Sequence, residues 1–516
     1  MLAPTVLAPG GPGNVLVRTE TGVYTARPEA LSQRRRREYR ERMTSREYDL
    51  IVIGAGAVGE NVADRAAQGG LSVVIVEAEL VGGDCSYWAC MPSKTLLRSA
   101  ASLRAAQNVD GARQAVTGEL DAAAVFARRD RIVHDWDDGG QVRWLEGAGI
   151  DLIRGHGSLT APKRVTVTSP EGGETRLVAR HAVAVCTGSA ALMPDVPGLR
   201  EVEPWSSRDA TSSPSAPVSL TILGGGVVAV EMATAYAGFG TDVTIVARSG
   251  LLSGVEDFAA QAVHEGLEAL GVTVRLNATA STVHGTDDGA VVVLSDGGRV
   301  AAERVLVATG RVPRTMRIGL ETVGLMPGEW LDVDDTLLVR GTDWLYAVGD
   351  VNHRALLTHQ GKYQARAAGD VIAARARGAA VQDAPWGAHV ATADHTAVPQ
   401  VVFSDPEVAS VGIGSAQAAA QGLPVRVVDV DLAELAGSST YSDDYRGQAR
   451  AVIDTDRHVL IGATFVGPDV AELLHAATIA IVGEVPLARL WHAVPPYPTV
   501  SELWLRWLEA YGRPVG

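Results

Sequence analysis

The sequence predicts an α/β fold with two Rossmann-like dinucleotide-binding domains, followed by a C-terminal α+β domain. Two observations predict the first part: a buried-strand pattern, a glycine-rich turn and a helical stretch occur in that order near residue 49 and again near residue 220. The third observation is that the strand–turn–helix order is not repeated after about residue 394. There, separated strand patterns at 398–403 and 450–453 precede amphipathic helical patterns at 470–483 and 501–511.

Length and composition limit the class of protein. At 516 residues the chain is too long for a single core, and 47% hydrophobic with 20% charged residues is typical of a globular protein rather than a disordered or collagenous one. A net charge of −15 argues against nucleic-acid binding, and no apolar run has the length of a membrane span. Three cysteines are too few for a secreted disulfide scaffold, so we expect a cytoplasmic protein.

Residues 1–44 differ from the rest, with Gly/Pro-rich turns and the basic run Arg34 to Arg37. We expect either that these residues form a disordered N-terminal arm, or that Met1 is an upstream start codon and translation functionally begins at Met43. A nucleic-acid or membrane arm is the other interpretation. No apolar core follows a basic start, so we expect no secretory leader.

The first nucleotide unit opens with the strand pattern 49–53 and the turn that carries Gly54, Gly56 and Gly59. Glycines there allow a tight turn, close approach of the backbone to a pyrophosphate, and close packing of helix on strand. Glu77 ends the next strand, 23 positions after Gly54, where a carboxylate can accept hydrogen bonds from a ribose. Strand, helix and acid together predict a bound dinucleotide.

The second unit follows a Ser/Pro-rich stretch at 206–217, which we expect to be a linker. It carries Gly224, Gly226 and Ala229 in the fingerprint positions. The strand that follows ends next to Arg248 and lacks an acid, which favours the 2′-phosphate of NADPH over NADH. Arg248 could equally be a solvated residue at a strand end, so NADH stays possible.

The segment from Gly82 to Lys94 contains Cys85 and Cys90 just before a helical pattern. A regular helix separates residues five apart by about 7.5 Å along its axis, whereas a disulfide needs Cα atoms about 4.4–6.8 Å apart. A bridge between these cysteines therefore requires a distorted helix start, where thiolates are reactive. The alternatives are two unrelated thiols or half of a metal site; no second Cys or His cluster is nearby, so we expect no metal. Cys186 lies in an apolar strand pattern and is expected in the core.

With these motifs the sequence resembles the FAD-dependent pyridine nucleotide–disulfide oxidoreductases, such as dihydrolipoamide dehydrogenase, glutathione reductase and mercuric reductase. The resemblance runs from about residue 47 to 512. Besides the two fingerprints and the cysteine segment, it depends on Cys186-Thr187-Gly188, Ala308 to Arg311, Tyr346 to Asp350, and Pro406 to Gly412.

The resemblance implies that FAD occupies the first fingerprint and NAD(P)H the second. Cys90 would be the thiol that contacts the flavin, Cys85 the interchange thiol, and Lys94 with Glu231 an ion pair near the flavin. Further cofactor-binding residues would be Gly83, Thr187, Gly188, Gly310, Gly349 and Asp350. The implied domains are 45–198 and 316–393 for FAD, 199–315 for NAD(P) and 394–516 for dimerisation, with each C-terminal segment completing the site of the partner in a homodimer.

One departure from the family concerns the C-terminal segment. Disulfide-reducing members have a histidine there, oriented by a glutamate five positions later, which protonates the leaving thiol. Here Tyr497 occupies the histidine position and Glu502 the glutamate position, while His492 lies five residues too early. A phenol with a pKa near 10 is a poor proton shuttle at neutral pH. Tyr497 could also be an interface aromatic without chemistry.

The predicted function is therefore an NAD(P)H oxidoreductase that passes electrons through FAD and a redox-active Cys85–Cys90 disulfide to a disulfide-type or other small-molecule acceptor. The alternatives are a quinone-type reductase that uses the flavin directly and a redox sensor without turnover. Mercuric reductase is less favoured, because those enzymes have a vicinal cysteine pair at the C-terminus and this sequence has no cysteine after Cys186.

Overall fold

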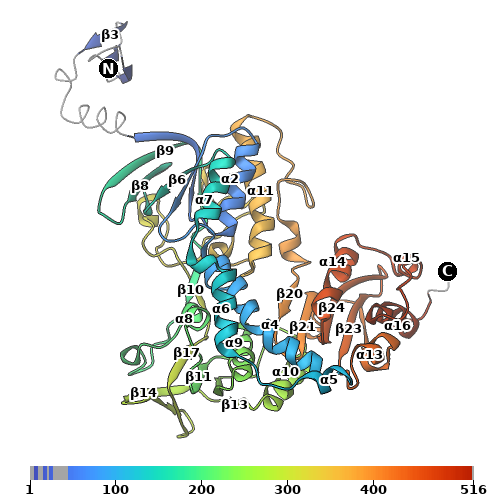
Figure 1. Ribbon diagram of the computed structural model, residues 1–516. Helices are drawn as coiled ribbons and strands as arrows, with labels where there is room; N and C mark the ends of the chain where they lie inside the picture. The colour runs from blue at the N-terminus through green and yellow to red at the C-terminus, as the bar shows by residue number, and fades with distance from the viewer. Residues whose placement is uncertain (1–4, 10–14, 20–21, 27–44, 514–516) are drawn as a thin grey trace.

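The structure is a computed structural model that describes residues 5–9, 15–19, 22–26 and 45–513 (Figure 1). Three large sheets form its framework: a mixed, mainly parallel sheet in the first nucleotide-binding layer, a fully parallel sheet in the second layer, and an antiparallel C-terminal sheet. The predicted mixed α/β fold is confirmed. Each sheet contributes to a hydrophobic core cluster of its own.

The first sheet has the strand order β6-β5-β4-β9-β8-β7, and β19 pairs with β9. Its strands are β4 (Ser45–Ile53), β5 (Val73–Glu77), β6 (Asp151–Arg154), β7 (His156–Ala161), β8 (Arg164–Thr168), β9 (Glu174–Val185) and β19 (Leu345–Ala347). The apolar run at the end of β4 is almost fully buried, because helices cover the sheet there. Helices α2 (Ala57–Gln68) and α11 (Thr358–Ala376) pack side by side against it (Figure 1). The latter lies 290 residues or more further along the chain, so two distant segments build this layer.

Between β5 and β6 the chain forms helices α3 (Gly83–Tyr87), α4 (Cys90–Gln107), α5 (Ala112–Ala115), α6 (Ala122–Ile132) and α7 (Gly139–Gly147). Helix α4 packs against α6 and also against α9 of the second layer. It thereby joins the two nucleotide-binding layers.

The second layer is a four-stranded parallel sheet in the order β13-β12-β11-β17. It comprises β11 (Ser219–Leu223), β12 (Asp242–Ala247), β13 (Thr273–Leu276) and β17 (Arg304–Val307), with helices α9 (Val227–Gly238) and α10 (Asp257–Ala269). An antiparallel sheet of β14 (Ala280–Thr286), β15 (Gly289–Leu294) and β16 (Arg299–Ala302) is inserted before β17. The short strands β10 (Ser189–Ala191) and β18 (Arg311–Pro313) pair with each other where the chain passes between the layers.

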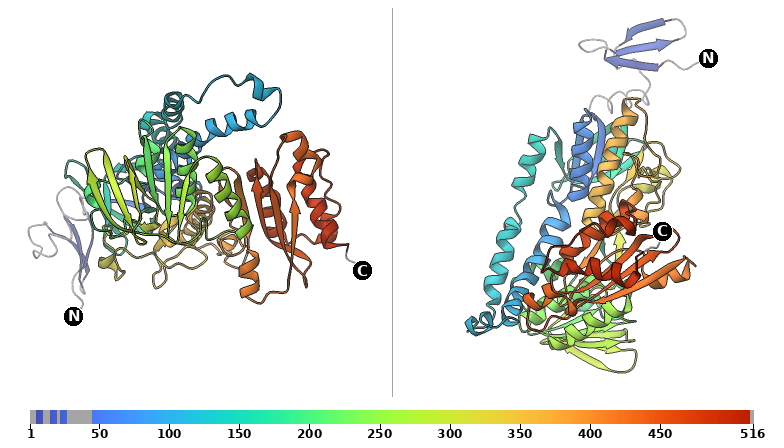
Figure 2. Two further views of the ribbon diagram at one scale, coloured as in Figure 1. Left: turned by 90° about the horizontal axis from the view of Figure 1, so that it is seen from below. Right: turned by 90° about the vertical axis from the view of Figure 1, so that its right-hand side faces the viewer.

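The C-terminal part is a five-stranded antiparallel sheet in the order β20-β21-β24-β23-β22. Its elements are β20 (Gln400–Val402), β21 (Glu407–Gly412), α12 (Ser415–Ala420), β22 (Val425–Asp431), α13 (Ala436–Tyr441), β23 (Gln448–Asp454), β24 (Val459–Gly467), α14 (Leu474–Val482), α15 (Leu487–Leu490) and α16 (Leu503–Tyr511). Figure 2 shows this part, coloured orange to red, beside the green second layer. Val402, Val408 and Val466 of its sheet belong to the same apolar cluster as the second layer.

Two expectations about connecting segments need correction. Within the stretch expected to be a disordered arm, the structure describes an antiparallel sheet of β1 (Thr5–Pro9), β2 (Val15–Thr19) and β3 (Gly22–Ala26); the rest of that stretch, including Arg34 to Arg37, lies outside the described residues. The expected linker at 206–217 contains helix α8 (Ser207–Ser212), because Ser206 and Asp209 cap its start reciprocally. Across the described part of the chain, no helix combines the length and apolarity needed to cross a bilayer.

Candidate redox site

The two cysteines lie on either side of a break between two helices. Cys85 is in α3 and Cys90 is the first residue of α4, while Trp88 (φ −137°, ψ 0°) and Ala89 (φ −131°, ψ −95°) leave the helical conformation. This break is the distortion that the disulfide geometry requires. Both cysteines are free thiols in the structure, which does not contain the expected disulfide.

The two thiols differ in acidity. The hydrogen bond from Cys85 is the largest influence lowering the pKa of Cys90, and Thr358 and the charge of Lys94 act in the same direction. The same hydrogen bond, together with burial, raises the pKa of Cys85. These influences favour Cys90 over Cys85 as the thiolate of the pair. Cys186 is buried in the core of the first layer, where burial raises its pKa.

Thr358, at the start of α11, is a contact that sequence reasoning missed. Its hydroxyl Oγ1 lies 3.3 Å from Cys90 Sγ, across 268 residues of sequence. A hydroxyl at this distance can donate to a thiolate and so stabilise it. No local pattern marks Thr358, because the contact depends on how α11 packs beside α2.

Lys94 and Glu231 form the predicted ion pair. Lys94 Nζ on α4 lies 2.8 Å from Glu231 Oε2 on α9, and the Glu231 side chain is only 5% exposed. Glu231 Oε1 also accepts a hydrogen bond from the Phe403 backbone N–H, and the Lys94 ammonium lies 4.9 Å from the centre of the Phe403 ring. Lys94, Glu231 and Phe403 therefore lie together, one helical turn after Cys90, and each belongs to a different one of the three predicted domains.

The first glycine turn has the close backbone approaches that a dinucleotide site needs. Gly54 has φ +101°, and a Cβ there would lie 2.5 Å from the Cys186 carbonyl oxygen. A Cβ on Gly59 would lie 1.9 Å from the Gly54 oxygen, so helix α2 packs directly on the turn. Gly83, with φ +60°, faces Gly56: a Cβ on it would come within 2.7 Å of the Gly56 Cα. Side chains at these positions would occupy the space beside the glycine turn where the pyrophosphate of a dinucleotide would lie.

Polar groups around this turn also fit FAD. Glu77 Oε2 accepts a hydrogen bond of 2.6 Å from the Ala55 N–H, and burial raises the pKa of Glu77. Thr187 Oγ1 is shielded from solvent and has no hydrogen-bond partner among the described residues. Asp350 accepts a hydrogen bond from Ser189 and lies 3.8 Å from Arg311 Nε. Gly188 and Gly349 both have positive φ, and Gly349 lies against Val58 at the start of α2.

The second turn has the same construction. A Cβ on Gly224, which has φ +127°, would lie 2.2 Å from the Ala308 oxygen, whereas Gly226 at the start of α9 faces open space. Ala229 is fully buried in α9, and Gly310 has φ +145°. Arg248 is exposed directly after β12, and no hydrogen bond or ion pair of the described residues involves it. Its guanidinium is free to meet an anionic group of a nucleotide.

A group of charged side chains connects the helix that contains Cys85 to helix α8, which lies between the two nucleotide-binding layers. The sequence analysis did not predict these ion pairs. Arg208 of α8 binds both Asp84, which precedes Cys85, and Glu79. The Arg208 guanidinium also lies 4.3 Å from the centre of the Trp88 ring. Asp84 thus fixes α3, and with it Cys85, to the segment between the two layers.

Tyr497 and Glu502 do not join this site within one chain. The Tyr497 side chain is 77% exposed, and among the described residues no hydrogen bond, ion pair or ring contact links it to Cys85 or Cys90. Glu502 is buried, and its Oε2 has no hydrogen-bond partner within the described ranges. His492 is exposed as well.

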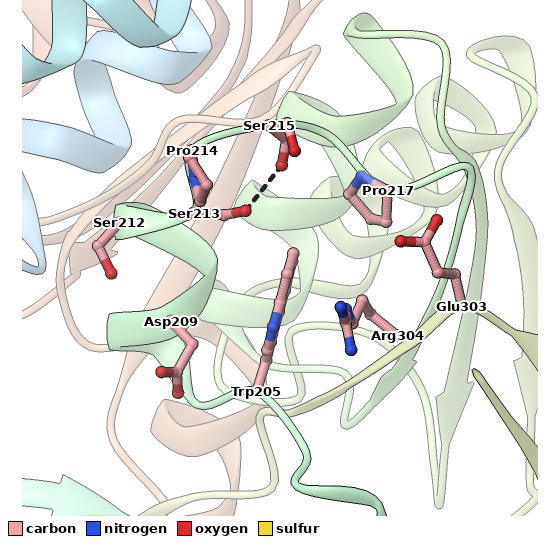
Figure 3. Close-up of a pocket in the computed structure, with 9 residues that line it drawn as sticks. All are labelled: Trp205, Asp209, Ser212, Ser213, Pro214, Ser215, Pro217, Glu303 and Arg304. Carbon is pink, nitrogen blue, oxygen red and sulfur yellow. Dashed lines mark hydrogen bonds between the residues drawn. The ribbon is translucent and has the colours of Figure 1, made fainter. Parts of the chain in front are cut away.

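A surface pocket of the second layer is lined by other residues than the predicted site (Figure 3). Its volume is about 340 Å³, and it is lined by Trp205, Asp209, Ser212, Ser213, Pro214, Ser215, Pro217, Glu303 and Arg304. None of these is a predicted site residue. Within the described residues, no group of three His, Cys, Asp or Glu side chains is placed to hold a metal ion.

Comparisons with known proteins agree with this arrangement. The family model of the pyridine nucleotide-disulphide oxidoreductases matches residues 48–375, and that of their dimerisation domain matches residues 398–507. A mercuric reductase from Shigella flexneri is 31% identical over 462 residues, which is 88% of this chain and 79% of that protein. A dihydrolipoyl dehydrogenase from Halobacterium salinarum is 31% identical over 466 residues, 88% of this chain and 94% of that protein.

Two solved structures share the fold. The flavoprotein disulfide reductase RclA from Escherichia coli, as its Cu(II) complex, superposes with a TM-score of 0.77 at 24% identity, covering 90% of this chain and 99% of that one. LpdA from Mycobacterium tuberculosis superposes with a TM-score of 0.76 at 25% identity, covering 89% and 99%.

Proposed function

The chain belongs to the pyridine nucleotide-disulphide oxidoreductase family, and on that premise we propose that it reduces a small acceptor through Cys85 and Cys90. Members of the family use FAD and NAD(P)H, and the chain carries their dimerisation domain. When bound, FAD supplies the two-electron carrier between the nicotinamide and the cysteine pair. The residues around the first turn fit that group.

One observation supports the proposal above the others: two thiols lie on either side of a helix break, and Cys90 Sγ lies 3.3 Å from the Thr358 hydroxyl. Cys90, with the lowered pKa, is the thiolate, held by Thr358 and near the Lys94 charge. Cys85 carries the proton and is the thiol that exchanges with the acceptor. Lys94 is positioned by Glu231, so that its charge stays beside the pair.

We infer the binding residues of the two cofactors from the same geometry. For FAD they are Gly54, Gly56, Gly59, Glu77, Gly83, Thr187, Gly188, Gly349 and Asp350; for the nicotinamide nucleotide they are Gly224, Gly226, Ala229, Arg248 and Gly310. Arg248 is exposed and has no ion-pair partner in the part of the chain that the structure describes, which supports NADPH over NADH. We place the activity in the cytoplasm, where a thiol pair can cycle in a reducing environment.

We propose a homodimer in which the exposed C-terminal segment of each protomer faces the cysteine pair of the other. Tyr497, in place of a histidine, would protonate a leaving thiol poorly, which keeps a quinone-type acceptor as the second candidate. Mercuric reductase activity is less favoured, despite relatives of that name, because the sequence has no cysteine after Cys186.

The test is steady-state oxidation of NADPH and NADH by the FAD-loaded protein with a panel of alkyl disulfides, aromatic disulfides, quinones and Hg²⁺. The proposal expects turnover with at least one disulfide or quinone, and loss of disulfide reduction in Cys85→Ser and in Cys90→Ser. A protein that binds no FAD, or that oxidises neither nucleotide with any acceptor, would contradict it. If the protein turns over only with quinones, and this activity persists in Cys85→Ser and in Cys90→Ser, the quinone-type reductase is the better assignment.

A further inference from the structure

The helix break between the two cysteines leaves two backbone carbonyls that the helices themselves do not satisfy. In a continuous helix the Trp88 carbonyl would accept a hydrogen bond from residue 92, but that residue is Pro92 and has no N–H. Tyr87 is the last residue of α3, and the last carbonyls of a helix have no partner within it. Buried backbone carbonyls need a donor, so both depend on other parts of the chain.

Thr211 of α8 supplies the donor for Trp88. Its hydroxyl Oγ1 lies 2.7 Å from the Trp88 carbonyl oxygen, across 123 residues of sequence, and Thr211 is only 3% exposed. The carbonyl oxygens of Ser207 and Arg208 lie 3.1 Å from the same hydroxyl, which has one hydrogen, so the Trp88 oxygen is its nearest acceptor. Helix α8 thus fixes the first residue of the break.

Trp136 supplies the donor for Tyr87. Its indole Nε1 donates a hydrogen bond of 3.2 Å to the Tyr87 carbonyl oxygen. The Tyr87 hydroxyl lies 3.3 Å from the Asp137 carbonyl oxygen and 3.1 Å from Gln141 Oε1. The segment that begins at Trp136 therefore binds Tyr87 through both its backbone and its phenol.

A buried arginine supports both donors. Arg129 on α6 is 1% exposed, and its guanidinium donates hydrogen bonds to the carbonyl oxygens of Thr211 and Ser213. The same guanidinium lies 5.3 Å from the centre of the Trp136 ring, and its charge is compensated by Asp130, whose Oδ1 lies 2.6 Å from Nε. Thr211 and Trp136 therefore share one support, although one lies on α8 and the other just after α6.

We propose that Thr211 and Trp136 are positioning residues for the redox pair. By binding the two carbonyls they keep the break in the conformation from which Cys85 and Cys90 close their disulfide. Both act through the backbone between the cysteines and not on substrate or cofactor. This inference deepens the proposed function and rests on it, because it concerns the same disulfide.

The physical reason is the backbone freedom that the break loses when the disulfide closes. In the dithiol form an unsupported break samples many conformations, whereas the disulfide restricts it to few. A break that is already fixed loses little freedom on closure, so its disulfide is more stable relative to the dithiol. Removing a donor leaves the carbonyl without its partner in both forms, and that penalty cancels. What remains is the added freedom of the dithiol, which shifts the equilibrium toward it.

The test measures the equilibrium constant between dithiol and disulfide in the FAD-loaded protein. The protein is equilibrated without oxygen in mixtures of reduced and oxidised dithiothreitol. The two protein thiols give two electrons and two protons to oxidised dithiothreitol; its S–S bond breaks and the Cys85–Cys90 bond forms. After acid quenching, free thiols are alkylated, and peptide mass spectrometry quantifies modified Cys85 and Cys90.

Two variants each remove one donor. In Thr211→Val, which keeps the branched side chain without the hydroxyl, we expect the equilibrium constant to shift toward the dithiol by at least about fivefold. Trp136→Phe, which keeps an aromatic ring without the indole N–H, should shift it in the same direction by about threefold.

Two further variants are controls. Thr211→Ser keeps a hydroxyl and should stay within about twofold of wild type. Ser212→Ala removes a hydroxyl from the next residue of α8, which donates to the Arg208 carbonyl oxygen at 2.7 Å and lines the pocket of Figure 3. It should also stay within about twofold of wild type.

An unchanged equilibrium constant in Thr211→Val or in Trp136→Phe, or a shift toward the disulfide, would overturn the role of that residue. Equal shifts in Thr211→Val and in both controls would overturn the inference as well, because any change in α8 would then loosen the break. If the wild-type protein forms no Cys85–Cys90 disulfide in any mixture, the proposed function itself fails. A wild-type disulfide with unchanged variants refutes the positioning role alone.

Discussion

The Lys94 ammonium lies 2.8 Å from Glu231 Oε2 and joins the helix that begins with Cys90 to the first helix of the second nucleotide layer. This contact spans 137 residues of sequence. Because Glu231 is nearly fully buried, its negative charge needs the Lys94 ammonium as a counter-ion. The ion pair therefore helps to fix the position of the second layer relative to the helix that carries Cys90.

We expect Glu231→Gln to lower the free energy of unfolding by about 1–2 kcal/mol, because the amide keeps one hydrogen bond but leaves Lys94 without its counter-ion. Urea denaturation of the FAD-loaded protein measures the difference. Glu434→Gln, at an exposed glutamate, serves as control and should change stability by less than about 0.5 kcal/mol. Equal stability of both variants would mean that the ion pair does not couple the layers.

Removing Cys85 should make Cys90 less acidic. The Cys85 hydrogen bond is the largest influence lowering the pKa of Cys90, so in Cys85→Ala that pKa rises and the thiolate fraction at neutral pH falls. We expect iodoacetamide to modify Cys90 roughly tenfold more slowly at pH 7 than in the reduced wild-type protein, with the two rates converging at high pH. Thr358→Val should act in the same direction with a smaller effect. A faster reaction in either variant would reverse our assignment of the thiolate.

Replacing Arg248 should change the choice of nucleotide. In Arg248→Ala we expect the KM for NADPH to rise about tenfold and the KM for NADH to stay within about twofold, since only NADPH carries the 2′-phosphate. Steady-state kinetics with both nucleotides measures this, and Arg299→Ala, in β16, is the control. If the two KM values change together, Arg248 is an ordinary strand-end residue.

Tyr497 offers a test of the C-terminal segment. We expect Tyr497→Phe to leave turnover within about twofold of wild type, because the phenol is a poor proton shuttle. Tyr497→His should raise the rate with alkyl disulfides roughly tenfold and add a pH dependence near 6.5, the reference pKa of imidazole. A large loss in Tyr497→Phe would show instead that the hydroxyl takes part.

The sequence predicted the parts of the site that local geometry dictates. Helix rise and disulfide geometry alone required a break between Cys85 and Cys90, and the structure has that break at Trp88 and Ala89. Helix α8 was missed although its signal was readable, because Ser206 and Asp209 have the spacing of a capping box.

Long-range contacts could not be predicted in the same way. Thr358 approaches Cys90 only because α11 returns to pack beside α2, and nothing in its own neighbourhood points to a thiol.

The central claim is that NADPH opens a disulfide between Cys85 and Cys90, and a thiol count tests it most directly. FAD-loaded protein is denatured anaerobically before and after addition of NADPH, and free thiols are titrated per chain. With three cysteines in the sequence, the account predicts one thiol before, from Cys186, and three after. The same count before and after NADPH would contradict it.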